Sequence, residues 1–145
     1  PVDFKALRKT LSAHGEIGEL TVPVLKQRIV EIGLHLRRRQ PKLFAEGRYL
    51  PLSITGSRRD HAIAFARALD GDYAITVVPR LMLGWLDPGV LFSGPEFWAD
   101  TAIEIPPGLQ GIKCDLLTGR HLDPGPRLPL GDILGVQPVA LIEPD

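Results

Sequence analysis

The hydrophobic pattern of the chain changes its period once, near residue 44, and this change limits the folds that the chain can adopt. Before Phe44, apolar residues recur at steps of three and four, which is the spacing of a helix face. After Phe44, apolar stretches are short and end at turn residues, as strands do. The sequence therefore predicts an α+β fold, with a helical segment over residues 1–44 and a β-domain over residues 45–145.

The helical segment contains one strongly amphipathic stretch. Thr21 fits an N-cap, and Pro23 is tolerated in a first helical turn, where its missing N–H costs little. Arg37 to Arg39 fit the last turn, where positive charge complements the helix dipole, and Pro41 ends the helix. The apolar face of this helix, here called the helical stripe, consists of Val22, Leu25, Ile29, Ile32 and Leu36.

The helical stripe requires a covering surface, because each exposed apolar side chain would cost roughly 1.5 kcal/mol or more. We expect it to pack on the β-domain of the same chain, or on the helical stripe of a second copy. A shorter helix is expected over residues 4–13.

The β-domain is predicted to be an antiparallel β-sandwich, because short strands follow one another with Gly and Pro between them rather than with helices. Asp70-Gly71 favours positive φ angles and therefore predicts a tight hairpin turn. Strands are expected at residues 49–54, 62–68, 73–78, 101–105, 111–117 and 136–142, with a shorter one near Leu128.

Charge and cysteine content exclude several classes of function. Seventeen basic and 17 acidic side chains cancel, so the 145 residues have no net field that attracts nucleic acid or an anionic membrane. The single cysteine, Cys114, cannot form an internal disulfide, which fits a reducing compartment. No apolar run approaches the roughly 20 residues that span a bilayer, and no signal segment is evident. We expect a cytoplasmic protein, and the first residue, Pro1, predicts that a preceding segment has been removed.

The histidines and the cysteine form no recognisable catalytic or metal-binding motif. The histidines are His14, His35, His61 and His121, and none is spaced as a zinc-binding pair is on a helix or hairpin. Cys114 lies in a predicted strand, where a small buried thiol is the ordinary interpretation, and no neighbour suggests a Cys–His pair. We therefore predict no bound metal and no cofactor.

Other residue types that carry chemistry also have structural explanations. Arg37 to Arg39, with Arg58 and Arg59, could bind phosphate, but the zero net charge and the absence of interleaved aromatics argue against it. Gly15 and Gly18 do not form a phosphate-binding loop, because the sequence around them lacks that motif. No nucleophile-elbow motif surrounds Ser53, Ser57 or Ser93.

Three acidic pairs are candidates for glycoside chemistry, which uses two carboxyl groups. The close pairs fall at an interhelical turn, a hairpin turn and the C-terminus, and they are Glu16 with Glu19, Asp70 with Asp72, and Glu143 with Asp145. None is placed where strand ends converge on a cleft, so we predict no catalytic residue.

Short stretches distributed over nearly the whole chain carry a family resemblance. Those in the helical part and its junction are Pro1–Phe4, Pro41–Phe44 and Gly47–Leu52. Those in the β-domain are His61–Arg67, Val77–Leu81, Trp98–Thr101, Asp115–Arg120 and Pro138–Leu141. The ordered set resembles the C-terminal part of the maltooligosyl trehalose synthases, members of glycoside hydrolase family 13 in the α-amylase clan.

The resemblance implies a domain attached to a (β/α)₈ barrel. In that family the barrel isomerises the reducing-end α-1,4 bond of a maltooligosaccharide to an α,α-1,1 bond, a step of trehalose biosynthesis. The implied nucleophile, acid/base and stabilising carboxylates belong to the barrel, before Pro1, and Asp3 is interpreted as structural. We therefore expect a noncatalytic C-terminal domain that is inactive alone, with the catalytic barrel and its maltooligosaccharide substrate as partners.

Two hypotheses from other classes remain. The first is a stand-alone carbohydrate-binding β-sandwich, whose candidate sugar platforms are Trp85, Trp98, Tyr49 and Phe97. Large aromatics in a sandwich are more often core residues, so two coplanar, solvent-facing rings on one sheet would be needed to favour this alternative. The second is a partner-binding module that uses the helical stripe.

Overall fold

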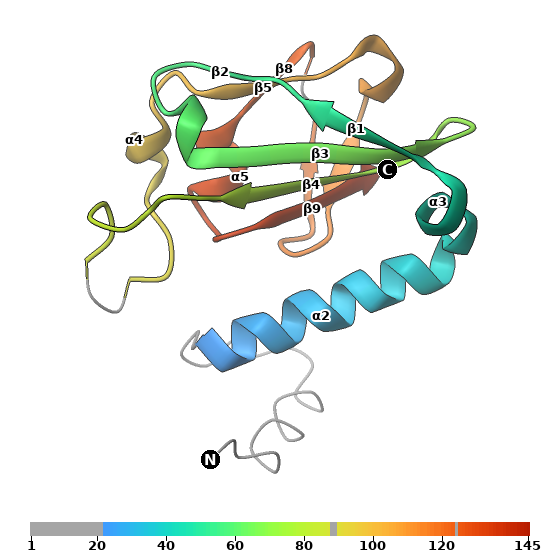
Figure 1. Cartoon of the computed structure of the whole chain (residues 1–145), viewed down its shortest axis with the longest axis horizontal. Helices are drawn as coiled ribbons and strands as arrows, with labels where there is room; N and C mark the ends of the chain where they lie inside the picture. Colours follow the sequence, from blue (N-terminus) through green and yellow to red (C-terminus); the bar gives the residue numbers. More distant parts are fainter. Residues whose placement is uncertain (1–21, 88–89, 124) are drawn as a thin grey trace. The chain divides into compact units, whose positions relative to one another are not determined.

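The structure is a computed structural model, and it describes residues 22–87, 90–123 and 125–145. The chain forms two compact units, Pro1–Arg39 and Gln40–Asp145. In the first unit the described part is one helix, α2 (Val22–Arg39), and the second unit contains the described strands (Figure 1). None of the helices in these described ranges combines the length and the hydropathy that crossing a bilayer requires.

Helix α2 coincides with the predicted amphipathic helix, and its last turn carries the three predicted arginines. Within the helical stripe, Leu25 and Leu36 are buried, Ile29 and Ile32 are partly buried, and Val22 is exposed. Several sequence predictions lie outside the described residues, namely the helix over 4–13, the Thr21 cap, Asp3, His14, Gly15, Gly18, Glu16 and Glu19.

The second unit is built on two antiparallel sheets. One has six strands in the order β1-β3-β4-β9-β6-β7, and the other has three in the order β2-β5-β8. Every pairing between described strands is antiparallel, so the predicted α+β class is confirmed, whereas the sandwich arrangement stays a prediction. The strands are β1 (Arg48–Leu52), β2 (Ile54–Thr55), β3 (Ala62–Leu69), β4 (Asp72–Pro79), β5 (Ala102–Glu104), β6 (Lys113–Asp115), β7 (Arg120–Leu122), β8 (Arg127–Pro129) and β9 (Ala140–Pro144).

The predicted hairpin turn joins β3 to β4. Leu69 pairs with Asp72, which leaves a two-residue loop of Asp70 and Gly71. Their φ angles are 51° and 97°, the positive values that a type I′ turn requires. The Asp-Gly prediction is therefore confirmed.

Short elements between the strands escaped the sequence pattern. They are α3 (Pro41–Glu46), η1 (Arg59–His61), α4 (Pro95–Trp98), η2 (Pro107–Leu109), α5 (Leu130–Leu134) and strand β7. None is long enough to show a helical or alternating repeat, since each has six residues or fewer. The last strand begins at Ala140 rather than near residue 136, and Pro138 before it has no N–H to donate to a ladder.

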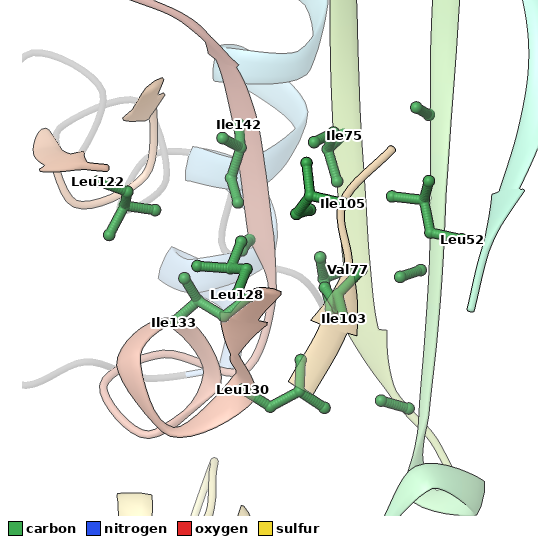
Figure 2. Packing of buried hydrophobic residues seen from close by; sticks show 14 of the residues in the cluster. Leu52, Ile75, Val77, Ile103, Ile105, Leu122, Leu128, Leu130, Ile133 and Ile142 are labelled. Atoms are coloured by element: carbon green, nitrogen blue, oxygen red, sulfur yellow. The ribbon is translucent and has the colours of Figure 1, made fainter. Parts of the chain in front are cut away.

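The hydrophobic core joins the two sheets. Ile75 and Val77 of β4 belong to the same buried cluster as Ile103 of β5 and the following Ile105 (Figure 2). The residues of β3 that face the core are small: Ala62, Ala64 and Ala66 are buried, whereas Ile63 is exposed. Helix α5 adds Leu130, Ile133 and Leu134 to this core.

Three glycine substitutions should separate backbone strain from steric clash. Gly71→Ala should lower the free energy of unfolding by about 1–2 kcal/mol, because φ is +97° and nothing lies near the added methyl. Gly56→Ala should cost more, since φ is +104° and a Cβ would lie 2.6 Å from Thr101 Cα. Gly108→Ala is the control, with open space around it, and should change stability by less than about 0.5 kcal/mol. Urea unfolding measures all three, and equal values for Gly56→Ala and Gly108→Ala would contradict the account.

Candidate functional site

Five side chains from separated parts of the second unit gather at one end of the sheets. Arg58 precedes η1, His61 ends it, and Trp85 comes from the connection between β4 and α4, while α4 supplies Phe97 and Trp98. We call this group the aromatic cluster: Arg58, His61, Trp85, Phe97 and Trp98.

The aromatic cluster is held by ring contacts and a stacked cation. The guanidinium carbon of Arg58 lies 4.1 Å from the Trp85 ring centroid and 4.9 Å from that of Phe97. The His61 ring meets both aromatic rings edge-on, at centroid distances of 5.7 and 5.6 Å. Phe97 also packs perpendicular to Trp98, at 5.0 Å. Such cation–π contacts contribute about 0.5–1 kcal/mol each at exposed sites.

Burial differs sharply across the aromatic cluster. Trp98 is 1% exposed and belongs to the core, whereas Trp85 is 49% exposed. Arg58, His61 and Phe97 are partly buried between them. The cluster thus connects the core to the surface through stacked side chains.

The loop that carries Arg58 is fixed by hydrogen bonds to the segment after α4. The backbone N–H and the hydroxyl of Ser57 donate to Asp100 Oδ1, at 2.9 and 2.7 Å. The N–H of Arg58 donates to Thr101 Oγ1 at 3.0 Å. The two hydrogen bonds from Ser57 hold the pKa of Asp100 below its ordinary value.

Two buried polar atoms of the aromatic cluster have no hydrogen-bond partner among the described residues. They are His61 Nδ1 and Trp98 Nε1. An unpaired buried polar atom costs about 1–3 kcal/mol, so each of these two atoms lowers the stability of the cluster.

Three of the four predicted sugar platforms therefore meet in one place. The fourth, Tyr49, packs instead against Phe65 on the neighbouring strand, with centroids 5.1 Å apart and planes tilted by 32°. Trp85 and Phe97 are inclined by 66°, and Trp98 is buried. None of the described ring contacts is coplanar, so they do not supply the platform that the carbohydrate-binding alternative requires.

The histidines do not assemble a metal site in the described part of the chain. His35 is exposed on α2, and His121 Nδ1 lies 3.2 Å from Asp145 Oδ2 at the surface. Within residues 22–87, 90–123 and 125–145, no three His, Cys, Asp or Glu side chains lie close enough together to hold a metal ion.

The environment of Cys114 could not be read from the local sequence. On β6 it pairs with His121 of β7 on one side and with Glu143 of β9 on the other. The thiol is partly buried, and Glu143 accepts a hydrogen bond from Gln40 Nε2 at 3.2 Å. A Cys–His neighbour pair therefore exists across strands, although the sequence suggested none. Only the register of β7, which the pattern missed, creates it.

Two acidic side chains hold a turn and the edge of a strand. Asp115 accepts the N–H of Leu117 and the hydroxyl of Thr118, at 3.1 and 2.7 Å, which holds the turn between β6 and β7. Glu104 on β5 accepts hydrogen bonds from Thr55 and Arg127 on the flanking strands, at 2.9 and 3.1 Å. These carboxylates are already occupied with structural partners.

Lys113 is a buried cationic residue that the sequence pattern did not predict. Its ammonium donates to the Gly111 carbonyl at 2.9 Å and lies 5.2 Å from the Tyr73 ring centroid. Burial lowers the pKa of Lys113, and the Asp123 carboxylate partly opposes this; burial also raises the pKa of Tyr73. The carbonyl and the ring face compensate for lost solvation, so the lysine has a structural explanation.

The fold defines an α+β domain in which Asp100, Glu104 and Asp115 bind groups of its own turns and strands. No model of a known protein family matches the chain. Two Mycobacterium tuberculosis proteins, from strains CDC 1551 and H37Rv, are each 32% identical to it over 119 residues. Both carry the name maltooligosyl trehalose synthase, and the match covers 82% of this chain and 13% of each relative.

A solved structure agrees with the sequence relatives. A point mutant of maltooligosyltrehalose synthase from Arthrobacter ramosus superposes with a TM-score of 0.73 and 29% identity. The superposition covers 99% of this chain and 17% of that enzyme. The chain is therefore homologous to one segment of the maltooligosyl trehalose synthases, and it spans less than a fifth of their length.

The Ser57–Asp100 contact should make stability depend on pH. Because hydrogen bonding lowers the folded pKa of Asp100 below 3.8, its contribution is present above that pH and is lost as pH falls through the folded pKa. Ser57→Ala should therefore lower the melting temperature at pH 7, and this difference should shrink in acid below pH 3.8. Ser53→Ala, at an exposed serine, is the control and should match the parent throughout. A Ser57→Ala deficit that is independent of pH would contradict this role.

Proposed function

We propose that the chain is the noncatalytic C-terminal β-domain of a maltooligosyl trehalose synthase. The observation that carries the proposal is the extent of the match, which covers nearly all of this chain and a small part of each relative. The whole enzyme would isomerise the reducing-end α-1,4 bond of a maltooligosaccharide to an α,α-1,1 bond in the cytoplasm. In this view the β-domain supports a separate catalytic barrel.

The way that the second unit uses its acidic residues supports this division of labour. Retaining glycoside chemistry needs two carboxyl groups about 5–5.5 Å apart in a substrate cleft. Asp115, Glu104 and Asp100 instead bond to groups of neighbouring turns and strands. Asp70 is part of the exposed hairpin turn and Asp72 follows it, where substrate could not be enclosed.

A chimera tests the proposal. The homologous segment of the Mycobacterium tuberculosis relative is replaced by this chain, and trehalosyl product formed from maltopentaose is measured. The chimera should retain isomerase activity within about tenfold of its parent, because the two segments are 32% identical over 119 residues. The isolated chain should form no product.

Two controls make the result specific. Replacing the same segment with an unrelated β-domain of similar size should abolish the activity. An inactive chimera that folds, or trehalosyl product from the isolated chain free of contaminating enzyme, would overturn the proposal.

We also propose that the helical stripe of α2 serves as a packing surface, and self-association through it is one candidate use. Ile29→Asp should lower the melting temperature, because Ile29 is a partly buried member of the stripe. If two copies associate through the stripe, the same change should also yield a monomer by sedimentation. Val30→Asp is the matched control, since Val30 is 58% exposed. Ile29→Asp behaving like Val30→Asp in both measurements would refute the packing role.

A further inference from the structure

The connection between β4 and α4 exposes an unusual set of large apolar side chains. Leu81 is 62% exposed, Leu83 is 100% exposed and Trp85 is 49% exposed. We call residues 81–87 the apolar loop, which extends beyond the end of the sheets at the left of Figure 1. Contiguous exposed apolar surface usually marks an interface, because leaving it in water is unfavourable.

The apolar loop has a defined turn that is closed by a backbone hydrogen bond. The N–H of Trp85 donates to the Met82 carbonyl at 3.0 Å and closes a turn with Leu83 and Gly84 at its tip. Gly84 has φ of +86°, the left-handed value that glycine accepts most easily. A loop held in one conformation loses less entropy when it binds.

The base of the apolar loop is attached to the aromatic cluster. At its start, the N–H of Arg80 donates to the His61 carbonyl at 2.7 Å. Further along, Trp85 stacks under Arg58 and contacts His61 and Phe97. Leu83 is therefore presented to its surroundings by a supported turn.

We propose that the apolar loop docks the domain onto the remainder of the same enzyme, with Leu83 inserted into an apolar recess there. This inference rests on the proposed function. The relatives supply the partner, because this chain corresponds to 17% of the solved enzyme and most of the polypeptide lies outside it. Trp85 and Arg58 would border the contact, and both residue types are enriched at interface hot spots.

The small size of the loop favours a partner within the same polypeptide over a second copy. A stable contact between free molecules buries about 800 Å² on each partner, more than the three exposed side chains of the loop provide. Within one polypeptide the effective concentration is in the millimolar range, so a smaller contact suffices.

A saccharide fits the apolar loop less well. The Leu83 side chain offers no hydrogen-bonding group, and Arg58 covers one face of Trp85 at 4.1 Å. Sugar recognition needs both a free aromatic face and hydrogen-bond partners for hydroxyl groups.

The test compares thiol labelling in the isolated chain and in the chimera described above. Leu83→Cys is introduced into a Cys114→Ser background, and its reaction rate with a maleimide is measured in both proteins. Labelling should be about tenfold slower in the chimera, which corresponds to about 1.4 kcal/mol of docking. Ile112→Cys in the same background is the control, because Ile112 is 55% exposed, and its rate should be the same in both proteins.

A second substitution guards against a thiol that itself prevents docking. Leu83→Asp should lower the melting temperature of the chimera by several degrees and leave that of the isolated chain unchanged, since Leu83 is fully exposed there.

The outcomes separate this inference from the proposed function. An active chimera in which Leu83→Cys labels as fast as in the isolated chain, and Leu83→Asp changes nothing, overturns the docking surface alone. Equal slowing of the Ile112 control also overturns it. If labelling of Leu83→Cys slows as the concentration of the isolated chain rises, the loop binds a second copy. If maltopentaose slows the labelling, the loop binds a saccharide. Either result overturns docking within one polypeptide. An inactive unsubstituted chimera removes the proposed function, and the inference falls with it.

Discussion

The structure of the second unit depends on the burial of one apolar layer to which residues of both sheets contribute. Each sheet has a face that must leave water, and a three-stranded sheet of two- and three-residue strands could not be stable alone. Val77 of β4 and Ile103 of β5 share one core, and the small alanines of β3 face the same interior. At about 25 cal/mol for each Å² of buried apolar area, this layer is the main favourable term.

The surface features follow from how that layer ends. Trp98 closes the core at one end of the sheets, and Phe97 next to it begins the stack that reaches Arg58 and Trp85. The segment before η1 is held against the segment after α4 by two features. Gly56 lies close to Thr101, and Ser57 donates hydrogen bonds to Asp100. The base of the exposed apolar loop packs on Phe97, which in turn packs on the buried Trp98.

The functional proposal rests on how polar residues are used as well as on homology. Enzyme sites concentrate carboxyl groups with perturbed pKa values in enclosed clefts. Among the described residues, Asp100 has a lowered pKa, lies at the surface and is bound by Ser57, while the buried Lys113 is paired with a carbonyl and a ring face. A domain that supports a separate catalytic part needs a stable core, and the shared core of this unit meets that requirement.

Features encoded over a few neighbouring residues were predictable from the sequence. Helix α2 follows from a local apolar repeat, and the hairpin turn follows from the φ preferences of Asp70 and Gly71. The contact between Arg58 and Trp85 was not predictable. Nor was the pairing of Cys114 with His121, because His121 lies on β7, which is too short to show alternation. Dihedral preferences and periodicity act over one turn or one strand, so the sequence alone determines local elements. Contacts between distant residues depend on strand order and register, which only burial of the shared core decides.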